Sequence, residues 1–174
     1  MHALTLLLLL ALGPATAQTA PEVDPASEPA ATPANGSVTG LPLPRFVSLK
    51  AEEANARRGP STAHAVEWVF RRPGMPLEVV AEYEHWRRVR DIDGVGGWVH
   101  YALLSGVRSG IVLEDLAAMT SHPGGGREVA RLEAGVVARL TECAEGFCRL
   151  SVGGQRGWLP EGALWGVRPA ERFD

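Results

Sequence analysis

The sequence has little lysine, little cysteine and no long apolar run. Of its 174 residues, 17 are basic and 20 are acidic, which gives a formal net charge of −3, and Lys50 is the only lysine. Nucleic-acid-binding proteins usually carry a basic excess, so this balance argues against a nucleic-acid partner. Two cysteines are too few for a four-cysteine zinc site. No apolar run reaches the roughly 18 residues of a membrane-spanning helix.

The motifs of common catalytic sites are also missing. The sequence contains no G-x-S-x-G, no phosphate-binding loop and no dinucleotide-binding glycine pattern. Asp91-x-Asp93-Gly94 resembles the start of a calcium loop, but the third oxygen ligand and the distal glutamate are absent. An Asp-Gly turn explains this segment without a metal. We therefore expect no enzyme activity, no cofactor and no metal site.

The first residues have the pattern of an export signal. Leu4 to Leu12 is apolar apart from Thr5, and Ala15-Thr16-Ala17 is a small-x-small cleavage motif. Residues 1–17 are therefore predicted to be a signal peptide. The mature protein is expected in the periplasm or outside the cell, without stable insertion into a membrane.

A proline-rich stretch follows. Residues 18–44 contain six prolines and no aromatic residue, so they offer little apolar surface to offset the entropy cost of ordering. Repeated proline favours an extended, semi-rigid spacer. We predict a disordered linker over 18–44. An alternative is that Leu41-Pro42-Leu43-Pro44 is a ligand for a polyproline groove.

Ordered identities about 60 residues apart reveal an internal repeat. Trp86 and Phe147 are 61 apart, as are Arg88 and Arg149, whereas Gly97-Trp98-Val99 and Gly157-Trp158-Leu159 are 60 apart. This period is too long for a solenoid unit but fits two tandem small domains. We place them at 45–113 and 114–174.

Both units have the pattern of β-structure. Short runs rich in valine and aromatic residues alternate with glycine-containing turns, which favours small barrels. Only two single turns, at 101–104 and 161–164, are expected to be 3₁₀-helical, and 115–119 is a candidate helical linker. The expected strands are 65–70, 77–83, 86–90 and 98–99 in the first unit, and 128–132, 136–142 and 147–152 in the second.

The short motifs along the two halves resemble those of the bacterial SH3-like (Src-homology-3-like) family of exported proteins. In the first unit these are Asn55-x-Arg57-x-Gly59-Pro60, Gly74-Met75-Pro76-Leu77, Tyr83-x-x-Trp86 and Gly97-Trp98-Val99. The second unit matches from Val129 onward but departs from the pattern at 119–124. The resemblance implies a five-stranded SH3-like barrel in each unit. It implies a non-catalytic binding scaffold whose ligands vary.

The two cysteines are expected to form a disulfide. Cys143 and Cys148 flank a turn at Ala144-Glu145-Gly146, so they fall on the two strands of one hairpin. Cross-strand Cβ atoms can reach the ~3.8 Å that a bridge requires, and an exported protein meets oxidising conditions. We therefore predict a structural bridge rather than a redox pair.

Aromatic and arginine residues of the first unit are the candidate ligand-binding residues. We select Arg57, Tyr83, Trp86 and Tyr101, because aromatic side chains provide contact area and arginine pairs with carboxylates. One residue of the Trp98-Val99 pair is expected in the core, and Trp98→Ala is expected mainly to unfold the barrel. An alternative is that the aromatics simply fill a small barrel.

These observations predict an exported, monomeric, all-β protein of two tandem SH3-like barrels. The leading functional hypothesis is non-catalytic binding of a cell-wall peptide, or of an extended segment of an envelope protein. One alternative is a purely structural tandem module. Another is an accessory factor that positions a separate wall hydrolase.

Overall fold

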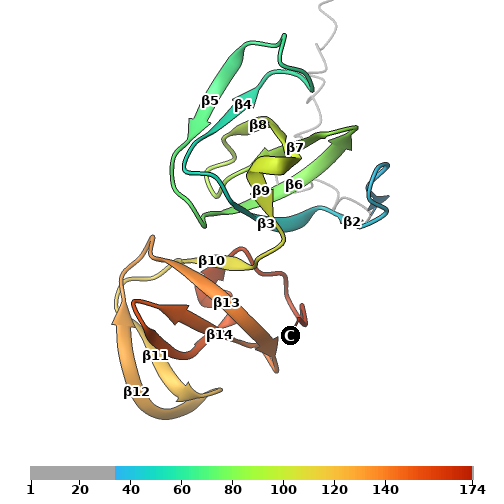
Figure 1. The fold of residues 1–174 in the computed structure, drawn as a ribbon. Coiled ribbons are helices and arrows are strands. Elements are labelled where there is room, and N and C mark those ends of the chain that lie inside the picture. Colours follow the sequence, from blue (N-terminus) through green and yellow to red (C-terminus); the bar gives the residue numbers. More distant parts are fainter. Residues whose placement is uncertain (1–33, 174) are drawn as a thin grey trace, which may run out of the picture. The chain divides into compact units, whose positions relative to one another are not determined.

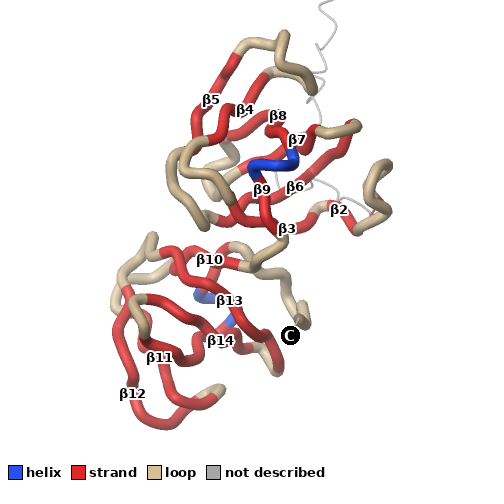
Figure 2. The backbone as a smooth tube through the Cα atoms, viewed as in Figure 1, coloured by secondary structure: helices blue, strands red, loops and turns tan. Residues whose placement is uncertain are grey.

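The computed structural model describes residues 34–173, which are almost entirely β-structure. Two seven-stranded antiparallel sheets contain most of the strands, and each sheet is curved (Figures 1 and 2). We call residues 45–105 barrel 1 and residues 109–165 barrel 2. Within residues 34–173, no helix is long and apolar enough to cross a membrane.

Barrel 1 has the strand order β5-β4-β8-β7-β6-β3-β9. Its single helical turn, η1 (Tyr101–Leu103), is of the 3₁₀ type that the sequence predicts. The strands are β3 (Arg45–Leu49), β4 (Ala54–Arg57), β5 (Val66–Phe70), β6 (Pro76–Tyr83), β7 (Trp86–Arg90), β8 (Gly96–His100) and β9 (Leu104–Ser105).

Barrel 2 repeats this order as β12-β11-β15-β14-β13-β10-β16, and η2 (Glu161–Ala163) corresponds to η1. The tandem all-β architecture is thus confirmed, with seven strands in each sheet rather than five. The strands are β10 (Ser109–Val112), β11 (Ala117–His122), β12 (Gly125–Leu132), β13 (Val137–Ala144), β14 (Phe147–Val152), β15 (Gln155–Pro160) and β16 (Leu164–Trp165).

The sheet of barrel 2 includes residues before the predicted boundary at 114, because strand β10 pairs with β13 and β16. One expectation about this region is wrong. The segment 115–119 is not a helical linker, because Ala117–His122 is strand β11. Met119 lies on that strand with its side chain fully buried, and the core contact favours the strand over a helical turn.

The predicted linker also ends earlier than expected. Residues 34–44 carry β1 (Ala34–Asn35) and β2 (Pro42–Leu43), which pair antiparallel, and the turn between them bonds to Glu82 of β6. The remainder of the linker, 18–33, and the predicted signal peptide, 1–17, lie outside the described residues.

Equivalent positions of the barrels are offset by 61 residues as far as β7 and β14. The offset is 60 from β8 and β15, because five residues separate the paired Arg90 and Gly96, whereas four separate the equivalent pair Ser151 and Arg156. The two cores use different side chains at equivalent positions. Barrel 1 buries Leu77, Val79, Val89 and Val99 where barrel 2 buries Ala138, Leu140, Leu150 and Leu159.

The Gly-Trp element places its tryptophan outside the core. Val99 is fully buried, whereas Trp98 is half-buried on the opposite face of β8. Gly97 is required because a Cβ there would lie 2.7 Å from the Arg57 carbonyl oxygen on β4. Since Trp98 is not the core residue of this pair, the expectation that Trp98→Ala mainly unfolds the barrel loses its basis.

The predicted bridge between Cys143 and Cys148 is present. The two residues are directly opposite each other across β13 and β14. Both are buried in the core of barrel 2. The bridge therefore cross-links the two strands from the core face of their hairpin.

Candidate binding face on the first barrel

Two rows of side chains cross the outer face of β7 and β8. The register places Trp86 opposite His100, and Arg88 opposite Trp98. Because side chains two residues apart on a strand point to the same face, all four lie on one surface. Arg88 is exposed and the other three are half-buried. We call this surface the β7–β8 face.

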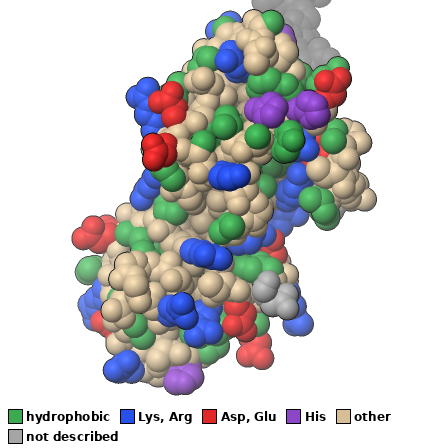
Figure 3. Space-filling model, viewed as in Figure 1, with side chains coloured by type: hydrophobic (Ala, Val, Ile, Leu, Met, Phe, Trp, Pro, Cys, Tyr) green, Lys and Arg blue, Asp and Glu red, His purple; other side chains and the backbone are tan. Residues whose placement is uncertain are grey.

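One end of this face is aromatic. The Trp86 and His100 rings pack edge to face with centroids 5.5 Å apart, and His100 lies 5.0 Å from Tyr101 of η1. His85 joins the cluster at 5.7 Å from Tyr101. Histidine side chains beside hydrophobic ones are visible on the molecular surface in Figure 3. The Trp86–His100 pair is edge to face and the two pairs with Tyr101 are tilted, so the rings contact one another while part of their surface stays exposed.

Tyr83 and Tyr101 are the most exposed aromatic residues near this end. About half of each side chain is accessible to solvent, and Tyr83 lies opposite Trp86 across the β6–β7 hairpin. The guanidinium carbon of Arg87 lies 6.0 Å from the centre of the Tyr101 ring. Three of the four predicted site residues, Tyr83, Trp86 and Tyr101, therefore occur at one end of the barrel.

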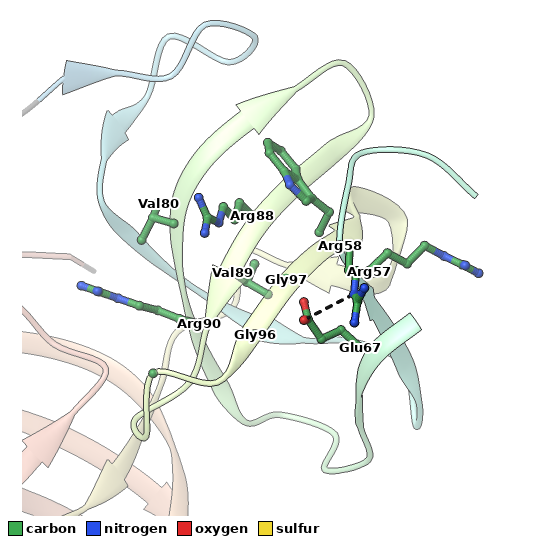
Figure 4. A pocket seen from close by; sticks show the side chains of 11 residues that line it. Arg57, Arg58, Glu67, Val80, Arg88, Val89, Arg90, Gly96 and Gly97 are labelled. Carbon is green, nitrogen blue, oxygen red and sulfur yellow. Dashed lines mark ion pairs between the residues drawn. The ribbon is translucent and has the colours of Figure 1, made fainter. Parts of the chain in front are cut away.

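The other end of the face is a basic hollow of about 540 Å³. Arg88 and Arg90 extend from β7 on one side, and an ion pair between Arg58 and Glu67 lies on the other (Figure 4). Arg90 also pairs with Glu78 of β6 at 2.6 Å. Gly96, Gly97 and Trp98 of β8 also line the hollow.

Arg57, the fourth predicted residue, lines this hollow rather than the aromatic end. Its position on β4 is opposite Trp98. Its Nη1 atom donates to the carbonyl oxygens of Thr62 at 3.2 Å and His64 at 2.7 Å. Arg57 thus holds the loop that joins β4 to β5, which leaves fewer of its N–H groups for a ligand.

The four residues selected from the sequence leave out three residues of the face, namely Arg88, Trp98 and His100. In the sequence, Trp98 is considered as one of the two core candidates of the Gly-Trp-Val element. The missing signal was register: aligning β7 against β8 in the sequence would have paired Trp86 with His100 and Arg88 with Trp98. Within residues 34–173, no group of three or more histidine, cysteine or acidic residues is placed to hold a metal ion.

A buried carboxylate orders the base of the aromatic end. The Glu82 side chain is inaccessible to solvent and pairs with Arg45 at 2.6 Å and with Arg87 at 3.5 Å. Burial alone would raise its pKa. Hydrogen bonds from the Thr39 hydroxyl and N–H, from Arg45 and from the Val38 N–H outweigh this and lower the pKa to about 2. Since Arg87 also approaches Tyr101, this network supports the aromatic cluster.

The strand order, the short 3₁₀ turn before the last strand and the repeated Gly-Trp element define a tandem pair of SH3-like barrels. The bacterial SH3 domain family matches the chain twice, over residues 50–106 and 114–166. The chain therefore belongs to the bacterial SH3 domain family. A search of curated proteins finds no match.

Two solved structures from Trichomonas vaginalis are similar to the chain at low identity. They are described as NlpC2 and NlpC1, and are 15% and 16% identical, each with a TM-score of 0.33. Each comparison covers 70% of this chain, but 48% of NlpC2 and 45% of NlpC1. The chain thus spans about half the length of these two structures.

Proposed function

We propose that this chain is a non-catalytic binding module of the cell envelope that recognises an extended ligand through the β7–β8 face. The observation that carries the proposal is the arrangement of that face, with an aromatic end followed directly by a basic hollow. Aromatic surface provides contact area at low entropy cost, and arginine pairs with carboxylates. An extended peptide or glycan strand bearing carboxylates fits both ends. Membership of the bacterial SH3 family and a disulfide are consistent with an exported protein.

The test is co-sedimentation of the full chain with isolated peptidoglycan. Trp86→Ala and Arg88→Gln are each expected to weaken binding about tenfold, which is typical of the loss of a central aromatic or charged contact. Phe147→Ala is the matched control, because Phe147 occupies the position of Trp86 in barrel 2. Arg71→Gln is the control for charge, because Arg71 pairs with Glu53 outside the face.

The controls should bind like the unaltered chain. Equal binding by all four variants would place the site elsewhere. If neither peptidoglycan nor a peptide library is bound at all, the tandem barrels act as a structural module. Retention of a wall hydrolase from an envelope extract, without binding to peptidoglycan, would instead favour the accessory role.

A further inference from the structure

Barrel 2 carries a second charged hollow on the face equivalent to the β7–β8 face. Its volume is about 300 Å³, and its lining comes from the three adjacent strands β13, β14 and β15. The lining residues are Arg139, Thr141, Arg149, Ser151 and Arg156. No acidic residue is among them.

The register explains why three arginines converge. Arg139 is opposite Ser151, and Ser151 is opposite Arg156, so these three residues form one row across three strands. Arg149 lies two residues before Ser151 on the same face of β14. Neighbouring strands are about 4.8 Å apart, so the three arginine side chains begin within roughly 10 Å of one another.

These charges have no partner within residues 34–173. None of the three arginine side chains forms an ion pair or a hydrogen bond there, although Glu142 lies opposite Arg149 across the hairpin. The Thr141 hydroxyl donates to the Arg149 carbonyl oxygen at 3.3 Å. The three positive charges repel one another across the hollow, and an anion bound between them would relieve this repulsion.

The equivalent row of barrel 1 is neutralised. Glu78 stands where barrel 2 has Arg139, and it pairs with Arg90 at 2.6 Å. Gly96 stands where barrel 2 has Arg156. Ser151 stands where barrel 1 has Arg90, so this row has two arginines and no carboxylate in barrel 2, but one arginine and one carboxylate in barrel 1. The excess of positive charge is local, because residues 114–174 contain seven basic and nine acidic residues overall.

We propose that this hollow binds a phosphate group carried on a soluble or polymeric ligand. A single carboxylate brings one negative charge, whereas a phosphate monoester brings about 1.5 to 2 near pH 7 and three acceptor oxygens. Planar guanidinium groups bind such oxygens in pairs. The Ser151 side chain, between Arg139 and Arg156 in the row, supplies one more donor. A membrane surface is disfavoured, because polybasic membrane segments carry clusters of about four to eight basic residues.

The test is calorimetric titration of the full chain with inorganic phosphate and with tripolyphosphate. We expect saturable binding, about tenfold weaker in each of Arg139→Gln, Arg149→Gln and Arg156→Gln, because each removes a charge-assisted contact. Arg127→Gln is the matched control, with the same change of charge on exposed residues of β12 in the same barrel. It should bind like the unaltered chain. Arg139→Lys keeps the charge and should retain part of the affinity.

Four results would overturn the proposal. They are absence of saturable binding, an equal loss of affinity in Arg127→Gln, binding of succinate as tight as that of phosphate, and binding only to phosphatidylglycerol vesicles. Thermal unfolding of each variant checks that it is folded. Peptidoglycan binding through barrel 1 is independent of this site, so either proposal can fail while the other stands.

Discussion

The two barrels link the strands of equivalent hairpins by different kinds of interaction. Glu82 and Arg87 of barrel 1 stand at the positions of Cys143 and Cys148 in barrel 2, and both pairs face each other across the equivalent hairpin. One hairpin is closed by a buried ion pair with hydrogen bonds, and the other by a covalent bridge. Both hairpins are therefore linked across their strands at the equivalent position, but the kind of link differs between the two repeats.

Each pair is also covered by a segment from outside its barrel. In barrel 1 the turn between β1 and β2 places the Val38 and Thr39 N–H groups on the Glu82 carboxylate, at 3.0 and 2.9 Å. Gly36 permits this approach, since a Cβ there would lie 2.3 Å from a carboxylate oxygen. In barrel 2 Phe173 bridges to Cys143 and packs on the core. A carboxylate needs donors around it, whereas a disulfide needs only an apolar cover.

The largest expected effect comes from breaking the ionic cross-link. Glu82→Gln leaves Arg45 and Arg87 partly buried without their counter-charge, which typically costs about 3 to 5 kcal/mol. Hydrogen exchange of the full chain should show faster opening of barrel 1 amides, with barrel 2 unchanged. Glu67→Gln, which removes an exposed ion pair with Arg58, should cost less than about 1 kcal/mol. A similar loss in both variants would contradict a special role for Glu82.

Acid should remove the same cross-link reversibly. The pKa of Glu82 is about 2 in the folded protein and 4.5 as its ordinary value. A lowered pKa means that its contribution to stability is complete above pH 4.5 and is lost as the pH falls from 4.5 to 2. The pKa of Glu171, in the segment that follows barrel 2, is lowered in the same way: burial would raise it, but hydrogen bonds from Arg108 and the Arg168 N–H outweigh this.

The pH effect of Glu82 is therefore measured as a difference. Unfolding of the unaltered chain and of Glu82→Gln is followed by urea titration between pH 6 and pH 2. The two stabilities should converge as the pH falls below 4.5, because the unaltered carboxylate becomes protonated. If the free energies of unfolding of the two proteins differ by a constant amount from pH 6 to pH 2, the charge of Glu82 is not what stabilises barrel 1.

Breaking the covalent cross-link should have a smaller effect. The cysteines are five residues apart in sequence, and the chain-entropy model for so short a loop gives about 2 kcal/mol. The Cys143→Ala/Cys148→Ala double variant should therefore lose about 2 kcal/mol in barrel 2 and nothing in barrel 1. Hydrogen exchange measures both barrels at once. Reduction of the unaltered chain should reproduce the pattern, and a loss confined to barrel 1 would refute it.

The tandem all-β fold could be predicted from the sequence because it depends on repeated local signals. Glycine turns, valine-rich strands and the Gly-Trp element each mark one step of the barrel, and their repetition reveals the second copy. The disulfide could be predicted for the same reason, since Cys143 and Cys148 flank a short turn. These features are all local in the chain.

The features that escaped prediction are set by contacts between distant residues. Residues 34–44 look like a spacer because their partner, Glu82, is about 40 residues away. The place of β10 in the sheet of barrel 2 depends on pairing with β13 and β16. The binding face likewise needs the register of β7 on β8, and Arg57 was assigned to a ligand without the loop carbonyls that it bonds.

The smallest expected effect concerns the charged row that distinguishes the two outer faces. Arg139→Glu introduces into barrel 2 the carboxylate that barrel 1 has at Glu78. It removes one of three clustered positive charges and supplies a partner for the other two, so barrel 2 should become more stable by up to about 1 kcal/mol. Because these side chains are exposed, the gain should shrink in high salt, where such interactions are screened.

Arg127→Glu, outside the row, should give no comparable gain. Urea unfolding at low and high ionic strength measures both variants. If Arg139→Glu instead destabilises barrel 2 at low salt, the three arginines do not repel one another, and the contrast between the neutralised row of barrel 1 and the uncompensated row of barrel 2 fails.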